Sequence, residues 1–403
     1  MPNLSIRYFL PSCPAKIEGH YFEKDAVHIL MVPDQRYKPR CHKCGSKSNN
    51  IHSYKRRPIR DLNLGKTQVF LHLRTRKIKC HHCLYVAVEE LYFATPYARV
   101  TNRMAVLIHA LCKELTVSQV ADHLGLDWKT VKEIDKKCLE KKYGETDYSN
   151  LRILAVDEIA IKKGHKYLTV VLDYETGRVV WMGEDRKAET LMAFFSGMTQ
   201  DQREGIKAVA MDMWDPFIKA TRTCLPNAKI VFDLFHVVSS FNKVIDKVRN
   251  EEYRKAKKED QRVYRGTKYL LLKKASKLKE EEREQLEALL RLNKNLSQVM
   301  ILRDMLKEIW NHTCRETAQK ALNEWCALAN SLDSPAVNAF GRMLKRHEYG
   351  ILNHCDYQIH TSKLEGVNNK IKLIKRKAYG YHDNRYFILK VLQAFPGKIR
   401  PPD

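Results

Sequence analysis

Residues 153–158 read Ile-Leu-Ala-Val-Asp-Glu, and residues 208–214 read Ala-Val-Ala-Met-Asp-Met-Trp. Each is an apolar run that ends in an acidic residue, a pattern typical of a buried strand that brings a carboxylate to the edge of a sheet. Phosphodiester cleavage with two divalent cations needs such oxygen ligands. Either acid alone is more simply explained as a surface carboxylate or helix cap, but the pair predicts a catalytic site at Asp157 and Asp212.

The sequence around these two runs alternates strand and helix patterns. We expect strands at residues 153–161, 167–173, 178–182, 206–211 and 229–232, with helices at 188–198 and 216–224. Three strands followed by helix, strand, helix and strand form a mixed α/β layer with the order of an RNase H-like core. The fold class is therefore multidomain α/β, with the first part of the catalytic core at residues 149–236.

Residues 237–360 contain almost no strand pattern and are rich in Lys, Glu, Leu and Arg. They predict an all-α insertion of long amphipathic helices that interrupts the core. A charged, solvated coiled-coil stalk and a DNA-gripping role both fit this composition.

The last segment, residues 361–403, is expected to return to the core as a helix and a tail. Apolar residues at 364, 367, 371, 374 and 378 have helical spacing and would pack on the sheet, and the helix is expected to end at Tyr379-Gly380. Another face then carries Glu365, Asn369, Lys372 and Arg376. Glu365 is the candidate for a third metal-binding acid, and Lys372 and Arg376 are candidate phosphate contacts, although a simple basic amphipathic helix has the same stripe.

Four of the eleven cysteines form two Cys-x-x-Cys pairs, Cys41/Cys44 and Cys80/Cys83, separated by a β-rich stretch of 35 residues that is long enough for a hairpin. Four thiolates at this spacing predict a closed tetrahedral zinc site, structural rather than catalytic. The neighbouring His42, His81 and His82 are expected to be bystanders. We assign residues 1–95 to a zinc-ribbon DNA-binding domain.

Basic residues between the two cysteine pairs suit phosphate contacts, with Arg56 and Arg57 as the candidates; an ordinary solvated face is the alternative. They lie in the runs 55–60 and 74–77.

Residues 96–148 predict a helix-turn-helix domain. The pattern is helical from Thr101 to about Tyr143 and is broken once, at residues 124–127, where Gly125 provides a turn. Asp127 would cap the second helix, so that Trp128, Lys129, Thr130 and Lys132 lie near the start of the recognition helix, where base contacts are usually made. Helix pairs with a glycine turn also occur in proteins that never bind DNA.

The charge balance favours a nucleic-acid partner, because Lys and Arg number 72 against 47 Asp and Glu. Composition alone also fits a ribosome-associated or membrane-surface protein. The excess lies outside residues 151–236, which carry as many acids as bases. Scattered remaining cysteines indicate a reducing compartment, and the sequence has neither a leader pattern nor a membrane-spanning apolar run. We expect a cytoplasmic protein with no membrane partner.

Taken together, these patterns resemble the transposases of the ISL3 family of insertion sequences, over essentially the whole chain. The resemblance rests on the cysteine pairs, the helix-turn-helix, Val-Asp-Glu at 156–158, Val-Ala-Met-Asp-Met at 209–213, Asp-Leu-Phe-His at 233–236, and Glu-Gly-Val-Asn-Asn-Lys-Ile-Lys at 365–372 followed by Arg376, Ala378, Tyr379 and Gly380.

The resemblance implies a DDE triad of Asp157, Asp212 and Glu365 that holds two Mg²⁺ or Mn²⁺ ions. It also implies strand cleavage at terminal inverted repeats, transfer of the 3′ hydroxyl to target DNA, a homodimer or larger assembly, and an association with the bacterial nucleoid. Asp233 is the alternative second acid. If Asp212 is that acid, Asp233 and His236 are expected to be accessory residues of the site. A histidine satisfied within the core is an equally good explanation of His236. The family shows Asp-Arg-Phe-His where this chain has Leu234.

Two other functions share these features. One is a DNA-binding regulator with an inactive RNase H-like domain, against which the complete set of acids argues. The other is a nuclease that cleaves DNA but never joins it. A magnesium-dependent cleavage and joining assay separates all three.

Overall fold

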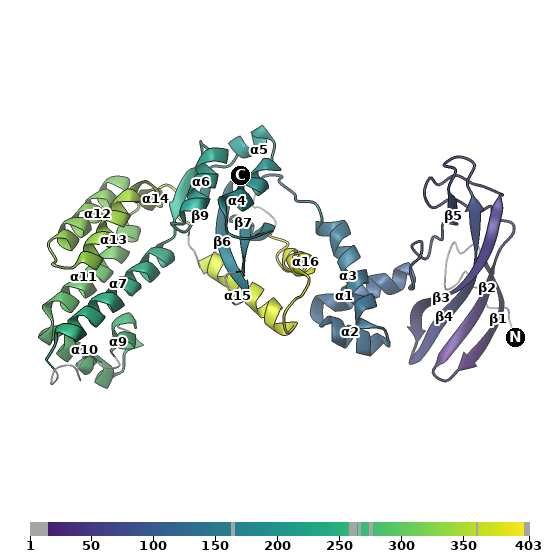
Figure 1. Cartoon of the computed structure of the whole chain (residues 1–403), viewed down its shortest axis with the longest axis horizontal. Coiled ribbons are helices and arrows are strands. Elements are labelled where there is room, and N and C mark those ends of the chain that lie inside the picture. The colour runs from purple at the N-terminus through teal and green to yellow at the C-terminus, as the bar shows by residue number, and fades with distance from the viewer. Residues whose placement is uncertain are drawn as a thin grey trace. The chain divides into compact units, whose positions relative to one another are not determined.

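The computed structural model describes residues 15–162, 166–257, 264, 267–273, 277–359 and 362–398. It forms two compact units, residues 1–142 and 143–403 (Figure 1). The first 14 residues of the predicted zinc ribbon, short pieces of the predicted insertion and the last residues of the predicted tail lie outside the described residues. The predicted boundaries of the individual domains stay predictions.

The first unit begins with a five-stranded sheet in the order β1-β2-β4-β3, with β5 beside β4. Its strands are β1 (Ala15–Glu23), β2 (Ala26–Pro33), β3 (Ile51–Leu64), β4 (Thr67–Lys79) and β5 (Val86–Val88). The antiparallel β3–β4 hairpin turns at Gly65, whose φ of 60° lies in the left-handed region that glycine adopts without strain. The stretch between the cysteine pairs therefore forms the predicted hairpin.

Three helices follow the sheet: α1 (Asn102–Glu114), α2 (Val117–Leu124) and α3 (Trp128–Tyr143). The prediction of a single break in this segment was wrong, because the chain also breaks between α1 and α2. Thr116 and Gln119 form a capping box there, which satisfies amides at the start of α2 and makes a new helix begin. Val120 of α2 and Val131 of α3 are buried in one hydrophobic core that these helices share.

The second unit contains a five-stranded sheet in the order β10-β9-β6-β7-β8. Its strands are β6 (Ile153–Lys162), β7 (Lys166–Asp173), β8 (Arg178–Glu184), β9 (Ala208–Met211) and β10 (Lys229–Phe232). β6, β9 and β10 run parallel to one another, and β7 is antiparallel to both β6 and β8. The connecting helices are α4 (Ala188–Ser196), α5 (Gln200–Glu204) and α6 (Asp215–Cys224). This is the predicted RNase H-like order.

Alternate residues of β6 contribute to different hydrophobic cores on the two faces of this sheet. Leu154 and Val156 belong to the core that includes α4 and α6, whereas Ala155 and Ile159 belong to the core that includes α15 (Ser362–Lys377) and α16 (Asn384–Ala394). Figure 1 shows α15 and α16, in yellow, beside the sheet. Helix α16 was not predicted from the sequence. It begins after Asp383, whose side chain accepts a hydrogen bond from the Tyr386 amide at 3.0 Å.

The segment between β10 and α15 is helical. Its helices are α7 (Leu234–Lys255), α9 (Lys268–Leu272), α10 (Glu280–Leu292), α11 (Lys294–Glu308), the 3₁₀ turn η3 (Ile309–Asn311), α12 (Arg315–Asn330), α13 (Pro335–Arg346) and α14 (Glu348–Leu352). Trp325 is completely buried among them and donates to the Leu302 carbonyl at 2.7 Å. The insertion is therefore a packed bundle, and the solvated-stalk interpretation was wrong.

The end of the insertion covers the edge strand β10. Gly350 of α14 lies against the Phe232 ring so closely that a Cβ there would be 2.5 Å from it. The Asn353 side chain donates to the Ile230 carbonyl at 2.8 Å. These contacts protect an otherwise unpaired edge and fix the chain where it returns toward α15.

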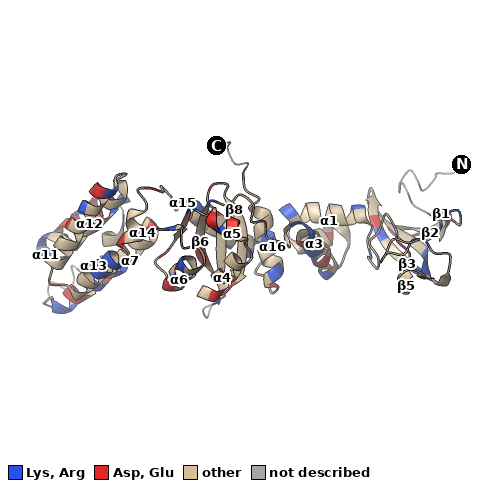
Figure 2. Cartoon of the chain, turned by 90° about the horizontal axis from the view of Figure 1, so that it is seen from above, with Lys and Arg blue, Asp and Glu red and all other residues tan. Residues whose placement is uncertain are grey.

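No helix in the described part of the chain combines the length and apolar character needed to span a bilayer. Lys and Arg recur along α3, the longest helix of the first unit (Figure 2).

Candidate catalytic carboxylates and DNA-binding surfaces

Asp157 and Asp212 lie at the same level of adjacent parallel strands. β6 and β9 pair Leu154 with Val209 and Ala155 with Ala210, so continuing this register by two residues sets Asp157 beside Asp212. Asp157 is half-buried, and its position in the alternation of β6 turns it toward the α15 face. The two predicted acids are therefore brought to one edge of one sheet.

The Asp212 carboxyl has a strongly perturbed pKa. The pKa is raised from an ordinary value of 3.8 to about 6, mainly by burial and also by the nearby Glu158 and Asp157 carboxylates, while His236 opposes the rise. Such a cluster of acids resists full ionisation until cationic charge arrives. Perturbed groups of this kind are concentrated at functional sites.

Asp212→Asn is expected to stabilise the protein at pH 8 without added Mg²⁺ or Mn²⁺. Because the folded pKa of about 6 lies above the ordinary value, the contribution of Asp212 to stability is present below about pH 4 and is lost as the pH rises through 6. Asparagine mimics the protonated form, so the melting temperature should rise by roughly 5 °C at pH 8 and stay unchanged at pH 4. Thermal unfolding followed by circular dichroism measures this, with exposed Asp201→Asn as control. Equal melting curves at pH 8 would contradict the prediction.

Asp233 follows β10 and is engaged in local structure. Its Oδ1 accepts a hydrogen bond from the Phe235 amide at 2.7 Å, which caps α7, and its Oδ2 lies 3.6 Å from Nε2 of His236. The side chain is only 6% exposed. By register Asp233 adjoins Asp212, because Phe232 pairs with Met211. It is well placed to support the site, and both of its oxygens have contacts within the chain.

α15 reaches the sheet through Asn368. Its Nδ2 donates to Oδ2 of Asp157 at 2.5 Å, while Leu364 and Ile371 anchor the helix in the core. Asn369, which was predicted to lie with Glu365 on a face of the helix other than the one packed on the sheet, is exposed. Glu365 is also exposed and lies one helical turn before Asn368, on the same side of α15 as the residue that contacts Asp157.

The three predicted acids do not converge as a closed cluster. Among the described residues, the cysteine group is the one set of three or more metal-binding side chains whose ligand atoms lie within 4.8 Å of one another. Ligands of two separate ions about 3.5–4 Å apart need not lie that close together.

Glu158 and Arg186 are site residues that the sequence analysis did not single out. The Arg186 guanidinium lies 3.2 Å from the Glu158 carboxylate. It also lies against the Tyr167 ring at 4.2 Å and the Trp214 ring at 4.7 Å. Glu158 could have been singled out because it directly follows Asp157. Arg186 could not, because it lies 28 residues further along the chain than Glu158.

The four predicted cysteines do meet in the first unit. Sγ of Cys41 lies 3.7 Å from Sγ of Cys83, and Sγ of Cys44 lies 3.6 Å from Sγ of Cys80. A tetrahedral zinc ion with bonds of about 2.3 Å would separate its sulfurs by about 3.8 Å, so this geometry fits zinc. The Ser46 hydroxyl and amide lower the pKa of the Cys44 thiol to about 6, which favours the thiolate that binds metal. His42 instead contacts the Val88 carbonyl.

The recognition helix begins as predicted. Oδ1 of Asp127 accepts hydrogen bonds from the Lys129 amide at 2.9 Å and the Thr130 amide at 3.2 Å. Trp128 is 52% exposed and Lys129 is exposed beside its ring, while Lys132 is half-buried. An exposed aromatic and basic surface thus lies at the start of α3.

Two arginines of the basic runs are structural. Arg60 is buried and donates to the carbonyls of Asp61 and Leu124, which ties the sheet to α2. Arg76 is buried in an ion pair with Glu89. Neither is available to phosphate, so for these two residues the expectation was wrong. Arg56 is exposed beside Glu18, and Arg57 is half-buried, which lowers the pKa of its guanidinium.

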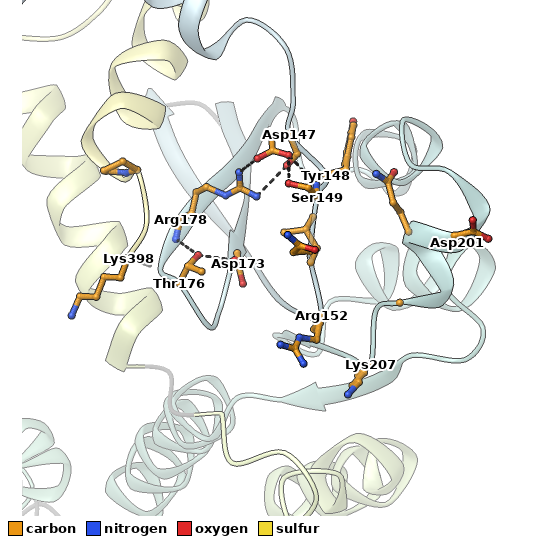
Figure 3. A pocket seen from close by; sticks show the side chains of 15 residues that line it. Asp147, Tyr148, Ser149, Arg152, Asp173, Thr176, Arg178, Asp201, Lys207 and Lys398 are labelled. Carbon is orange, nitrogen blue, oxygen red and sulfur yellow. Dashed lines mark hydrogen bonds and ion pairs between the residues drawn. The ribbon is translucent and has the colours of Figure 1, made fainter. Parts of the chain in front are cut away.

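A cavity of about 850 Å³ lies at the opposite ends of the strands from the acids. It is lined by residues 147–152, which lead into β6, and by the β7–β8 turn (Figure 3). Its charged groups are largely paired with one another, as Arg178 is with Asp147 and Asp173 with Thr176. We assign it no role in the chemistry.

An RNase H-like sheet with aligned acids, a helix-turn-helix and a four-cysteine cluster define a DNA-recombining class of protein. Family models agree: a transposase model matches residues 154–391, a transposase zinc-finger model matches 38–83, and the helix-turn-helix domain of transposase family ISL3 matches 89–139. The chain belongs to the ISL3 family of insertion-sequence transposases. It has the domains of such a transposase: a zinc ribbon with a four-cysteine cluster, a DNA-binding helix-turn-helix and a transposase domain.

Known relatives match along nearly the whole chain. The transposase for insertion sequence element IS1001 of Bordetella parapertussis is 38% identical over 363 residues, which are 89% of each chain. The transposase for insertion sequence element IS1557 of Mycobacterium tuberculosis is 25% identical over 94% of this chain and 92% of its own length. The family resemblance drawn from the sequence is confirmed.

Proposed function

We propose that the chain cleaves DNA at the terminal inverted repeats of its insertion sequence and transfers the exposed 3′ hydroxyl to target DNA. Asp157, Asp212 and Glu365 are the proposed catalytic residues. In the first step, water attacks the phosphorus atom and the 3′ oxygen leaves. In the second, that 3′ oxygen attacks a phosphodiester of the target and displaces its 3′ oxygen. Each step exchanges one P–O bond for another.

The observation that carries this proposal is the alignment of Asp157 and Asp212 on adjacent parallel strands, with the Asp212 pKa raised to about 6. Asn368 supports it by orienting the Asp157 carboxylate from α15. The contacts of Asp233 with the Phe235 amide and His236 support a positioning role for Asp233 and His236, and favour Asp212 as the second acid.

The donor set fits Mg²⁺ or Mn²⁺. It consists of hard oxygens, and both Oδ1 of Asn368 and Oε2 of Glu158 are buried without a hydrogen-bond partner among the described residues. We propose that Asp157, Asp212 and Glu365 hold two ions, which would activate the attacking oxygen and stabilise the leaving oxygen. Asp157 would hold the ions together with Asp212 and Glu365, and Lys372 and Arg376, both exposed on α15, would contact DNA phosphates.

The first unit is proposed to select the DNA. The exposed start of α3, with Trp128, Lys129, Thr130 and Lys132, would read bases, and Arg56 and Arg57 of the zinc ribbon would contact phosphates. Two element ends must be brought together for transfer, so we propose a homodimer or larger assembly that acts on chromosomal DNA at the nucleoid.

Lys129→Ala is expected to weaken binding to the element's end by about 5- to 150-fold, because base-reading contacts contribute about 1–3 kcal/mol each. Binding to unrelated DNA should fall much less. Fluorescence anisotropy at fixed salt measures both affinities. Lys113→Ala removes an equally exposed charge from α1 and serves as the control. Equal losses for both DNAs would show that Lys129 contributes charge alone.

The test of the proposed reaction is a labelled duplex that carries the element's end, incubated with Mg²⁺ or Mn²⁺ and target DNA. Cleavage followed by joining is the expected result. Cleavage without joining would identify a nuclease, and binding without cleavage would identify a DNA-binding regulator.

A further inference from the structure

A second cavity, of about 590 Å³, opens beside the acidic end of the sheet. Tyr167 and Trp214 supply aromatic rings to its wall, and Arg186, Lys187 and Lys219 supply cations. Its volume is within the range of about 300–1,000 Å³ typical of sites for small organic groups. The lining therefore combines flat apolar surfaces with positive charge.

The arginine in this cavity is held as part of a stack. Its guanidinium lies against both aromatic rings, and its backbone carbonyl accepts a hydrogen bond from Nε1 of Trp214 at 3.1 Å. The Arg186 side chain is 32% exposed, so the stack is open to the cavity. Flat nucleobases bind to such surfaces, because they stack equally well on aromatic rings and on guanidinium planes.

Two contacts join this cavity to the proposed catalytic residues. The Trp214 amide donates to Oδ1 of Asp212 at 3.2 Å. Arg186 is paired with Glu158, the neighbour of Asp157 in the chain. A group bound in the cavity would thus lie next to a phosphodiester held at Asp157 and Asp212.

The acids of the cavity wall help to define the ligand. Asp185, Glu189 and Asp215 lie among the cations, so the site is poorly suited to a bare phosphate. A nucleotide suits it better, because its base offers amino groups to carboxylates and a flat face to the rings, while its phosphate meets the lysines.

We infer that this cavity binds one unpaired nucleotide of the element's end, taken out of the duplex next to the phosphodiester that is cut. The inference rests on the proposed function for its DNA substrate. Extracting a base would open the strand beside the phosphodiester, and stacking on Trp214 and Arg186 would offset the lost pairing.

The test places 2-aminopurine at one position at a time through the last base pairs of the element's end. Binding is followed by fluorescence with the Asp157→Asn chain and Mg²⁺, so that the DNA stays intact. We expect one position to change fluorescence on binding far more than the others. Trp214→Ala should abolish that change and weaken binding at least about fivefold, and Arg186→Ala should weaken binding similarly.

Trp214→Phe keeps a ring and should keep the signal. Tyr269→Ala removes an exposed aromatic from α9, away from the cavity, and should leave both signal and affinity unchanged. Thermal unfolding checks each variant, and Arg186→Ala decides the outcome if Trp214→Ala does not fold. Uniform fluorescence changes that persist in both alanine variants would overturn the inference. A failure of the proposed function would be seen in a different measurement, as an unsubstituted chain that does not cut the same DNA.

Discussion

Asp157→Asn is expected to lower the rate of Mg²⁺-dependent cleavage at the element's end by at least about a thousandfold. Metal-assisted charge stabilisation contributes several kcal/mol to such reactions, and each 1.4 kcal/mol of lost transition-state stabilisation is a factor of ten. Asp157 is central because it lies beside Asp212 in the sheet register and is oriented by Asn368. Asp212→Asn and Glu365→Gln should have comparable effects.

The rate is measured in single-turnover cleavage, with DNA affinity determined separately so that loss of binding is not mistaken for loss of chemistry. Asp201→Asn is the matched control, since Asp201 is an exposed acid of α5 in the same unit. Asp233→Asn should reduce the rate by a smaller factor, because its contacts are with the start of α7. A thousandfold loss for Asp233→Asn, with activity retained in Asp212→Asn, would show that Asp233 and not Asp212 is the second catalytic acid.

Local patterns were enough to predict the strands that carry the two aspartates and the pairing of the cysteines. An apolar run followed by an acid determines a strand and its end, and two-residue spacing brings two thiolates to one ion. The position of Asp212 beside Asp157 followed only from the parallel pairing of β6 with β9, which joins segments some 55 residues apart. The predicted strand order was sufficient to anticipate it.

Contacts between individual side chains of distant segments could not be predicted. Asn368 and Asp157 are 211 residues apart, and helical spacing singled out Asn369, on the face of Glu365, rather than Asn368. Charge patterns also do not reveal burial: Arg60 and Arg76 have the same sequence context as exposed Arg56, yet they are enclosed by carbonyls and by Glu89. Tertiary packing decides which basic residues are left for DNA.

Cys41→Ser is expected to abolish zinc binding and to unfold the zinc end of the first unit. The buried core there consists of Cys41, Ile78, Cys80 and Ala87, which bury too little apolar surface to order the two loops alone. Structural zinc contributes about 10–16 kcal/mol to comparable small sites. The larger core of the same sheet, around Leu71 and Leu73, is expected to persist.

Zinc content measured by atomic absorption should fall from one ion per chain to none. Limited trypsin digestion should then cut after Lys43, in the first of these loops, and after Lys79, the last residue of β4 before the second loop. Cys314→Ser is the control, because Cys314 is an exposed cysteine outside the cluster, and it should keep one zinc and the wild-type digestion pattern. A Cys41→Ser protein that retained stoichiometric zinc, or resisted trypsin as the wild type does, would show that the sheet orders these loops without the metal.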